Sequence, residues 1–279
     1  MRYAAHLAAP LGDVRLVLLH VDQLPTYGLP EGSILDASTR EEWTRRLDAL
    51  ATLSSATIEI ETAVRQGRAH SGILEAADEL GAELIVMGST GHSSLQAALL
   101  GSVTEKTMRL SPIPVVVIPS GSAPPPTGAR SALLPVDVSA EHSVEATHRA
   151  IRAAVALGAE QARLLHVFEV PLSLALMADR PRRAQAVASL RARERARLSS
   201  LEGLCQDRGV ELETAFTEGV VHGEIARRAM TDDFDLIVMP THARHALGQL
   251  LLGSVVAKVV RTATMPVCAL RIPEILGPS

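Results

Sequence analysis

A segment rich in glycine and serine, between residues 88 and 102, is the part of the sequence best suited to chemistry. It reads G-x2-G-x9-G-S, with glycines at 88, 91 and 101 followed by Ser102. The segment directly follows the apolar run 84–87 and precedes a stretch of helical composition, which is where open α/β sheets bind ligands. Glycines there permit positive φ and let backbone amides approach a ligand closely.

The start of the following helix carries a second signal. Ser102-Val103-Thr104-Glu105 has the capping-box pattern, so Ser102 is expected to cap the helix while Glu105 reaches back to the cap amide. The free amides and the positive end of the helix dipole would then face one cavity. Such a cavity suits an anion such as phosphate.

The elements that must position this segment occur twice in the chain. Residues 64–119, shifted by 152, align with 216–271, and 18 of the 56 positions are identical. The matches are clustered: 84–87 with 236–239, 99–103 with 251–255, 114–115 with 266–267 and, at a shift of 146, 18–21 with 164–167. We therefore predict two copies of one domain, at 1–119 and 131–273. The linker 120–130 contains three consecutive prolines, which favour an extended chain.

Each copy alternates apolar strand patterns with helical patterns. The second copy contains five predicted strands, at 132–136, 163–168, 211–216, 236–239 and 267–270, separated by four helices. This alternation predicts a parallel sheet covered on both faces, an α/β fold. In a doubly wound sheet of order 3-2-1-4-5 the first strand is central.

The first copy has no counterpart of residues 131–146, so it is expected to lack strand 1. Losing several buried aliphatic side chains, at roughly 1.5–3 kcal/mol each, would remove much of a domain's stability. Two hypotheses follow. Either the given start is internal to a longer reading frame, or another segment fills the vacant position.

Composition narrows the class of protein. The 27 Lys and Arg against 31 Asp and Glu leave a net charge of −4, and aromatic residues are 2% of the chain. These values disfavour a nucleic-acid binder or a ligand held mainly by stacking. Two cysteines are too few for a disulfide framework or a four-ligand zinc site. The absence of a long apolar run or signal-peptide pattern predicts a cytoplasmic protein that does not associate with membranes.

The stretch 85–91, continuing through 99–105 to 114–119, closely resembles the carboxyl-terminal signature of the universal stress protein family. The resemblance covers nearly the whole chain, as two tandem domains. It implies a Rossmann-like fold of the adenine nucleotide alpha hydrolase type, with five parallel strands, and binding of ATP, commonly with Mg²⁺. It also implies pairing through the last strands, 115–118 and 267–270, so the chain looks like an intramolecular pseudo-dimer that could form a further homodimer.

Carried over residue by residue, the resemblance implies a nucleotide site in the first copy. Val21 and Met87 match positions that line the adenine. The phosphate and ribose side would be formed by Gly88, Thr90, Gly91, Gly101, Ser102, Val103 and Thr104. The family's adenine-side acid, which follows strand 1, has no counterpart in the first copy as given.

The second copy keeps a different part of the site. Asp137 matches the adenine-side acid, and Gly253 and Ser254 match the second glycine–serine pair. Pro240-Thr241-His242-Ala243 stands where the first copy has its glycine loop. Proline removes an amide donor and alanine adds a Cβ, so nucleotide binding there is not expected to be efficient.

Three functions fit these observations to different degrees. The first is a stress protein that binds ATP in its first copy, without efficient turnover. The second is a scaffold that binds no nucleotide and acts through its pseudo-dimer surface. The third is an adenine-nucleotide-dependent enzyme, which is disfavoured because the P-loop, G-x-S-x-G and H-E-x-x-H motifs are missing.

Two further features have simple structural interpretations. His20 and His166 stand at equivalent strand positions without ligand-spaced partners, which favours structural roles over metal binding. The arginines between residues 180 and 197 favour a solvated helix face over a docking patch for an acidic partner.

Overall fold

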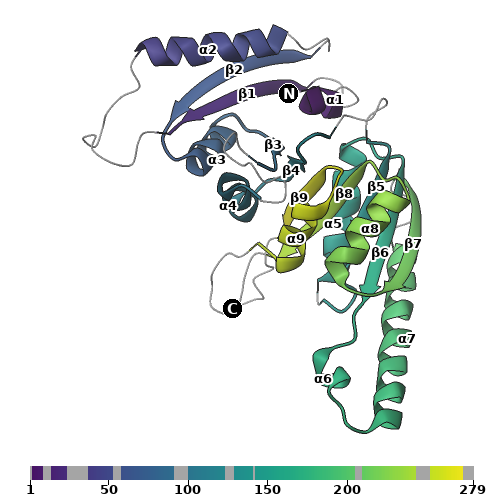
Figure 1. Ribbon diagram of the computed structural model, residues 1–279. Coiled ribbons are helices and arrows are strands. Elements are labelled where there is room, and N and C mark those ends of the chain that lie inside the picture. Colours follow the sequence, from purple (N-terminus) through teal and green to yellow (C-terminus); the bar gives the residue numbers. More distant parts are fainter. Residues whose placement is uncertain are drawn as a thin grey trace, which may run out of the picture.

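The chain folds into two α/β copies that share one central sheet (Figure 1). The computed structural model describes residues 2–8, 14–23, 37–52, 58–90, 100–122, 129–140, 142–204, 209–242 and 252–272. The predicted α/β class and the tandem arrangement are confirmed.

The shared sheet has seven strands in the order β3-β4-β9-β8-β5-β6-β7. They are β3 (Ile85–Gly88), β4 (Val115–Ile118), β5 (Ser131–Pro135), β6 (Gln161–Phe168), β7 (Glu211–Glu218), β8 (Leu236–His242) and β9 (Val267–Ile272). Within the second copy all neighbouring strands are parallel, and β5 lies between β6 and β8. The carboxyl ends of these strands therefore meet at one edge of the sheet.

The two copies meet where β4 pairs with β9 in antiparallel orientation. Val116 lies opposite Cys268, and both side chains are fully buried. Burial raises the pKa of the Cys268 thiol to about 12. Because the pairing is antiparallel, the carboxyl end of β4 lies beside the amino end of β9, so loops of both copies meet there.

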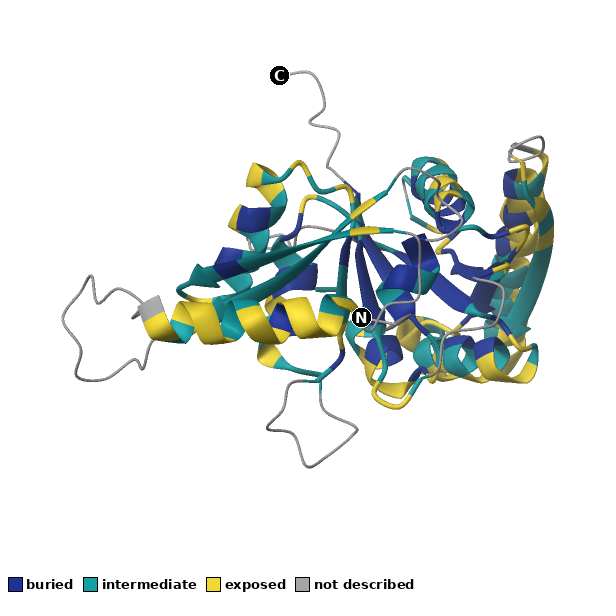
Figure 2. Ribbon diagram, turned by 90° about the horizontal axis from the view of Figure 1, so that it is seen from above, coloured by how far each residue is buried: buried dark blue, intermediate teal, exposed yellow. Residues whose placement is uncertain are grey.

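Helices cover both faces of the sheet (Figure 2). On one face, α5 (Ser143–Ala156) and α7 (Arg180–Leu204) bury apolar side chains in a cluster that contains Val116. On the other face, α4 (Ser102–Leu110), α8 (Val221–Thr231) and α9 (Ser254–Thr262) form a cluster with Val115 and Val117. The split follows from the strand repeat of two, which sends successive side chains to opposite faces.

The rest of the first copy forms a small sheet of its own. Strands β1 (Arg15–Asp22) and β2 (Glu59–Gln66) pair in parallel, and α2 (Ala37–Thr52) packs on them. Helix α3 (Ala69–Glu79) contacts both β1 and α4. In the part of the chain that the structure describes, no strand lies between β1 and β3, the position that β5 occupies in the second copy.

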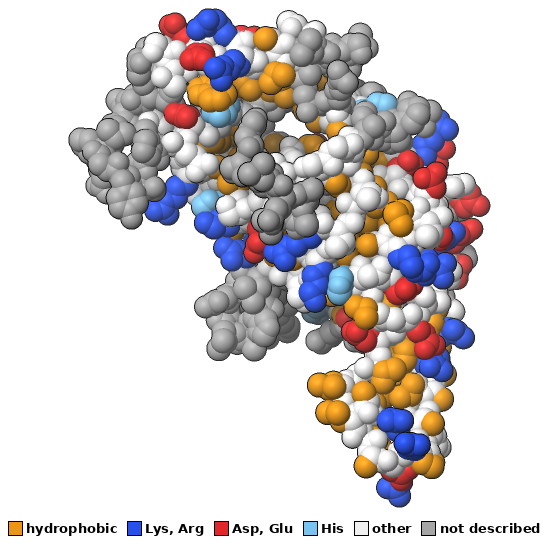
Figure 3. All heavy atoms as spheres, in the orientation of Figure 1, with side chains coloured by type: hydrophobic (Ala, Val, Ile, Leu, Met, Phe, Trp, Pro, Cys, Tyr) orange, Lys and Arg blue, Asp and Glu red, His pale blue; other side chains and the backbone are white. Residues whose placement is uncertain are grey.

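A helical arm projects from the second copy (Figure 1). It consists of α6 (Leu172–Ala175) and the first half of α7, and Figure 3 shows hydrophobic and arginine side chains at its tip. Deeper along α7 the arginines have partners: Arg191 pairs with Glu218 at 2.7 Å, and Arg195 lies 4.6 Å from the Phe216 ring centroid. Among the described helices, none has the length and apolar character needed to cross a bilayer.

The short helix α1 (Arg2–Ala8) packs against the shared sheet. Tyr3 and Leu7 are buried in the same cluster as Val116 of β4 and Leu134 of β5. Burial, reinforced by the negative charge of Asp235, raises the pKa of Tyr3 to about 12. The Asp235 carboxylate also accepts hydrogen bonds from the amide and hydroxyl of Ser131.

The raised pKa of Tyr3 predicts how stability depends on pH. An unfolded tyrosine ionises near pH 10, so folding favours the neutral phenol and this contribution to stability is intact below that pH. The free energy of unfolding should therefore fall as the pH rises from about 10 towards 12. In Tyr3→Phe this fall should be smaller, as urea unfolding at several pH values would measure. An unchanged slope would contradict the burial of the phenol.

Candidate functional site

The candidate site lies at the carboxyl end of β3, where the chain leaves the sheet and α4 begins. The backbone of Ser89 fixes this geometry, since its amide donates to the Ile118 carbonyl at 2.9 Å and its carbonyl accepts from the Gly101 amide at 2.8 Å. The buried hydroxyl of Thr104 donates to the Gly88 carbonyl at 2.9 Å. The first turn of α4 is thus attached to the end of β3 by backbone and side chain together.

The first turn of α4 contains three amides that have no hydrogen-bond partner among the described residues. The first intrahelical hydrogen bond runs from the Glu105 amide to the Gly101 carbonyl at 2.9 Å. The amides of Ser102, Val103 and Thr104 precede it and make no hydrogen bond to the described residues. Three amide donors and the positive end of the helix dipole make this turn suited to an anion.

The capping box predicted at this turn does not form. Gly101, not Ser102, is the N-cap residue, and no side chain caps the helix. Ser102 is the first helical residue and is exposed, while Glu105 faces Arg261 of α9 at 3.8 Å. The prediction is wrong because Gly101 is held by Ser89, which places the helix start one residue earlier.

Gly88 and Gly101 also lack the positive φ that the sequence pattern suggests for them. Gly101 has φ −64°, and Gly88 is not among the glycines with positive φ, so neither needs a left-handed backbone. A Cβ at Gly101 would lie 3.4 Å from the Ser89 carbonyl oxygen, an ordinary contact. Gly91 lies outside the described residues.

The other residues predicted for the first-copy site lie in different parts of the structure, and only some of them are next to this turn. Thr90 is adjacent, and its hydroxyl pairs with the Ser120 hydroxyl at 2.8 Å. Met87 lies on β3 and is half-buried. Val21 belongs to the separate β1–β2 sheet and packs on α3, where a Cβ at Gly72 would come within 2.9 Å of it. Val21 and Met87 therefore belong to different sheets in the structure.

The second copy differs at the corresponding edge. Strand β8 continues through Pro240 and Thr241 to His242, paired with β9 up to Ile272, whereas β3 ends at Gly88. The Thr241 side chain is buried and its hydroxyl donates to the Leu270 carbonyl at 3.3 Å. Residues that correspond to the phosphate loop are therefore part of the sheet in this copy.

The remaining second-copy site residues lie on the same edge. Gly253 is the N-cap of α9 and Ser254 its first residue, as Gly101 and Ser102 are in α4. Asp137 follows β5 and is exposed, and its carboxylate accepts hydrogen bonds from the amide and hydroxyl of Ser139, at 2.9 and 2.6 Å. The acid is held in a local turn.

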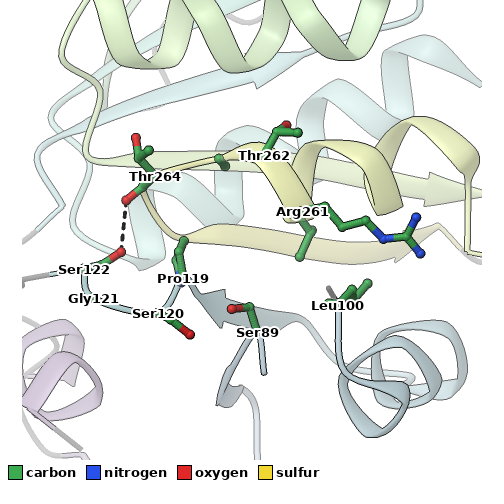
Figure 4. Close-up of a pocket in the computed structure, with 11 residues that line it drawn as sticks. Ser89, Leu100, Pro119, Ser120, Gly121, Ser122, Arg261, Thr262 and Thr264 are labelled. Atoms are coloured by element: carbon green, nitrogen blue, oxygen red, sulfur yellow. Dashed lines mark hydrogen bonds between the residues drawn. The ribbon is translucent and has the colours of Figure 1, made fainter. Parts of the chain in front are cut away.

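A cavity of about 370 Å³ adjoins the first-copy site at the seam (Figure 4). Ser89, Leu100 and Ser120 line it from the first copy. The carboxyl-terminal end of α9 lines it from the second copy, including Arg261 and Thr264. The sequence pattern did not single out Ser89 or Arg261, because contacts between the copies depend on how β4 pairs with β9.

A buried histidine–carboxylate contact in the second copy, between His166 and Glu194, also had no sequence signal beyond the repeated histidine. His166 Nδ1 lies 3.0 Å from the Val136 carbonyl oxygen, and Nε2 lies 2.9 Å from a Glu194 carboxylate oxygen. Both residues are buried. The equivalent His20 instead stacks on Trp43 with ring centroids 3.7 Å apart. Each histidine thus packs between its strand and the following long helix.

The fold and the candidate site together define a tandem Rossmann-like protein in which α4 of the first copy begins directly after the end of β3. Comparison with known proteins identifies the family to which the chain belongs. The profile of the universal stress protein family matches residues 1–119 and 129–271, so the chain belongs to this family.

Individual relatives agree with this assignment. Universal stress protein MJ0531 of Methanocaldococcus jannaschii is 31% identical over 121 residues, which cover 42% of this chain and 71% of that protein. Universal stress protein Sll1654 of Synechocystis is 41% identical over 71 residues, 25% of this chain and 45% of that protein. A universal stress protein of Archaeoglobus fulgidus has the same fold, with a TM-score of 0.70 at 21% identity, covering 96% of this chain and 92% of that one.

Proposed function

We propose that this universal stress protein binds one ATP in its first copy and that nucleotide occupancy regulates its interactions. The observation that carries the proposal is the start of α4, at the end of β3, where the amides of Ser102, Val103 and Thr104 make no hydrogen bond to any described residue. Phosphate groups bind such helix starts because both the amides and the dipole favour negative charge. Val21 and Met87 would line the adenine.

The second copy would bind nucleotide poorly, since β8 runs on to His242 where a phosphate loop would leave the sheet. Asp137 remains available there as an acid for an adenine amino group. Each copy therefore retains a different part of a complete site, and one nucleotide per chain is the stoichiometry that we propose.

The described residues fit a phosphate group better than a protein-bound metal. They contain no cluster of three or more His, Cys, Asp or Glu side chains that could hold an ion. Mg²⁺ would therefore be held by phosphate oxygens and water, which is its usual mode with nucleotides. The ion would neutralise phosphate charge, while the amides of α4 orient the phosphates.

A direct binding measurement tests the proposed function. Native mass spectrometry and isothermal titration of the whole chain with ATP and Mg²⁺ should show saturable binding of one nucleotide per chain. Hydrolysis should stay well below about 1 s⁻¹, because the described site supplies amides and hydroxyls but no positioned base. No binding at millimolar ATP would reject the proposal and favour a scaffold that acts through its pseudo-dimer surface.

A further inference from the structure

We infer that the first copy binds an extended apolar segment of a partner protein in the slot between β1 and β3. The bound segment would pair with both strands, in the position that β5 occupies in the second copy. Affinity would come from main-chain hydrogen bonds and specificity from the side-chain pockets on either face. The internal repeat makes the positions of the two copies equivalent, so the second copy shows what such a strand contacts.

Two strand edges border the slot. Among the described strands, β1 pairs only with β2, and β3 only with β4. In the second copy the equivalent strands, β6 and β8, both pair in parallel with β5. In Figure 1, β1 lies on the side of the small sheet that is nearer to β3, and Figure 3 shows a hollow at this place with hydrophobic side chains around it. A single inserted strand would therefore satisfy the main-chain groups of both edges.

Identical residues along these edges are less buried in the first copy than in the second. The leucine pair at 164–165 of β6 is at most 1% exposed, whereas the identical pair at 18–19 of β1 is only partly buried. The Val-Met pair at 238–239 of β8 is at most 4% exposed, whereas the identical pair at 86–87 of β3 is again only partly buried. Since the residues are the same, the difference comes from what packs on them, and β5 is the strand that pairs with both β6 and β8.

Helix α3, which packs on β1, shows the same difference. Its Ile73 and Ala77 are partly buried, whereas the equivalent Ile225 and Ala229 of α8 are at most 1% exposed. In the second copy these two side chains share a cluster with Leu133 of β5. The first copy thus offers aliphatic side chains from two strands and a helix to an inserted strand.

The strand β5 defines the chemistry of the segment that fits. It is five residues long, and its Ala132, Leu133 and Leu134 are fully buried. Leu134 lies in the cluster on one face of the sheet and Leu133 in the cluster on the other. Strands buried on both faces are continuous apolar runs, whereas strands buried on one face alternate with polar residues. The segment that fits the slot is therefore extended, about five residues long and aliphatic at three consecutive positions.

A flexible segment of a partner fits the slot better than a second folded copy of this chain. The inserted strand must offer both of its edges, one to β1 and one to β3. An edge strand of a folded protein keeps one edge paired within its own sheet, as β7 does with β6. A disordered partner segment has both edges free, at the cost of the entropy lost when it becomes ordered.

A synthetic peptide with the sequence of residues 129–140, which include β5, is the probe. Labelled with a fluorophore, it should bind the whole chain saturably in anisotropy measurements, and unlabelled it should raise the Tm because it binds only the folded state. Both results are expected with or without ATP, so they do not depend on nucleotide binding. The matched control peptide carries Leu133→Lys and Leu134→Lys and should bind at least about tenfold more weakly, because burying an unpaired charge is unfavourable.

Hydrogen exchange locates the bound peptide. Amide protection should increase in β1 and β3 and stay unchanged in β6 and β8, which already pair with β5. Equal affinity of the two peptides, protection gained only elsewhere, or no saturable binding at about 1 mM peptide would overturn the inference. A dimer in sedimentation that excludes the peptide would also overturn it, because a second copy would then fill the slot.

Discussion

Replacing His166 with alanine should lower the free energy of unfolding by about 3–5 kcal/mol, because it leaves the Glu194 carboxylate and the Val136 carbonyl buried without their hydrogen-bond partner. Both ring nitrogens of His166 face acceptor oxygens, the Val136 carbonyl at 3.0 Å and the Glu194 carboxylate at 2.9 Å. Alanine would leave both acceptors buried and unpaired. Since domains are stable by only about 5–15 kcal/mol, urea unfolding should show this loss clearly.

Two variants control for the loss of side-chain volume and of charge. Glu194→Gln can still donate an amide hydrogen to a neutral imidazole, so its cost should stay near 1 kcal/mol, that of one altered hydrogen bond. His20→Ala removes the equivalent histidine of the first copy and should cost about 1–2 kcal/mol. Burial holds the pKa of His20 below its usual value, and its ring stacks on Trp43. Equal losses for His166→Ala and His20→Ala would contradict the importance of the buried His166–Glu194 hydrogen bond.

The parts of the fold that could be predicted are those encoded in local patterns. The apolar runs at 84–87 and 236–239 became β3 and β8, and the internal repeat became two copies of one fold. These strands form where apolar side chains are buried, and the spacing of apolar residues in the sequence therefore predicts them. The glycine–serine pairs at 101–102 and 253–254 likewise mark the starts of α4 and α9.

The details of the site depended on contacts that no local pattern records. Gly101, not Ser102, is the N-cap of α4, because the Gly101 amide donates a hydrogen bond to the carbonyl of Ser89, which lies outside the helix. Strand β8 extends beyond the apolar run 236–239 to His242 because β9 pairs with it as far as Ile272. Arg261 reaches Glu105 only because β4 and β9 pair in antiparallel orientation. In each case tertiary structure determined what a short motif does.

Introducing a carboxylate at the start of α4 should have the largest effect on ligand binding. In Ser102→Glu the new charge lies in the first turn of α4, beside the three amides that no described residue pairs with, and it would repel a phosphate there. At roughly 5 Å and an effective dielectric of about 20–50, the repulsion between two unit charges amounts to about 1–3 kcal/mol, or from about tenfold to a few hundredfold in affinity. A carboxylate in the first turn also interacts favourably with the helix dipole, by about 0.3–1 kcal/mol. The variant should therefore lose ATP affinity without losing stability.

The second copy offers a matched control. Ser254 is the first residue of α9, as Ser102 is of α4, and both are exposed. Ser254→Glu makes the same change in net charge at the equivalent position. Because residues 240–242 of the second copy remain in strand β8, this change should leave ATP affinity unaltered.

Isothermal titration of the wild type, Ser102→Glu and Ser254→Glu with ATP and Mg²⁺ therefore tests most directly whether the start of α4 holds the nucleotide. We predict one site per chain in the wild type and in Ser254→Glu, and binding at least tenfold weaker in Ser102→Glu. Equal affinity in all three proteins, or loss of binding only in Ser254→Glu, would contradict a phosphate site in the first copy.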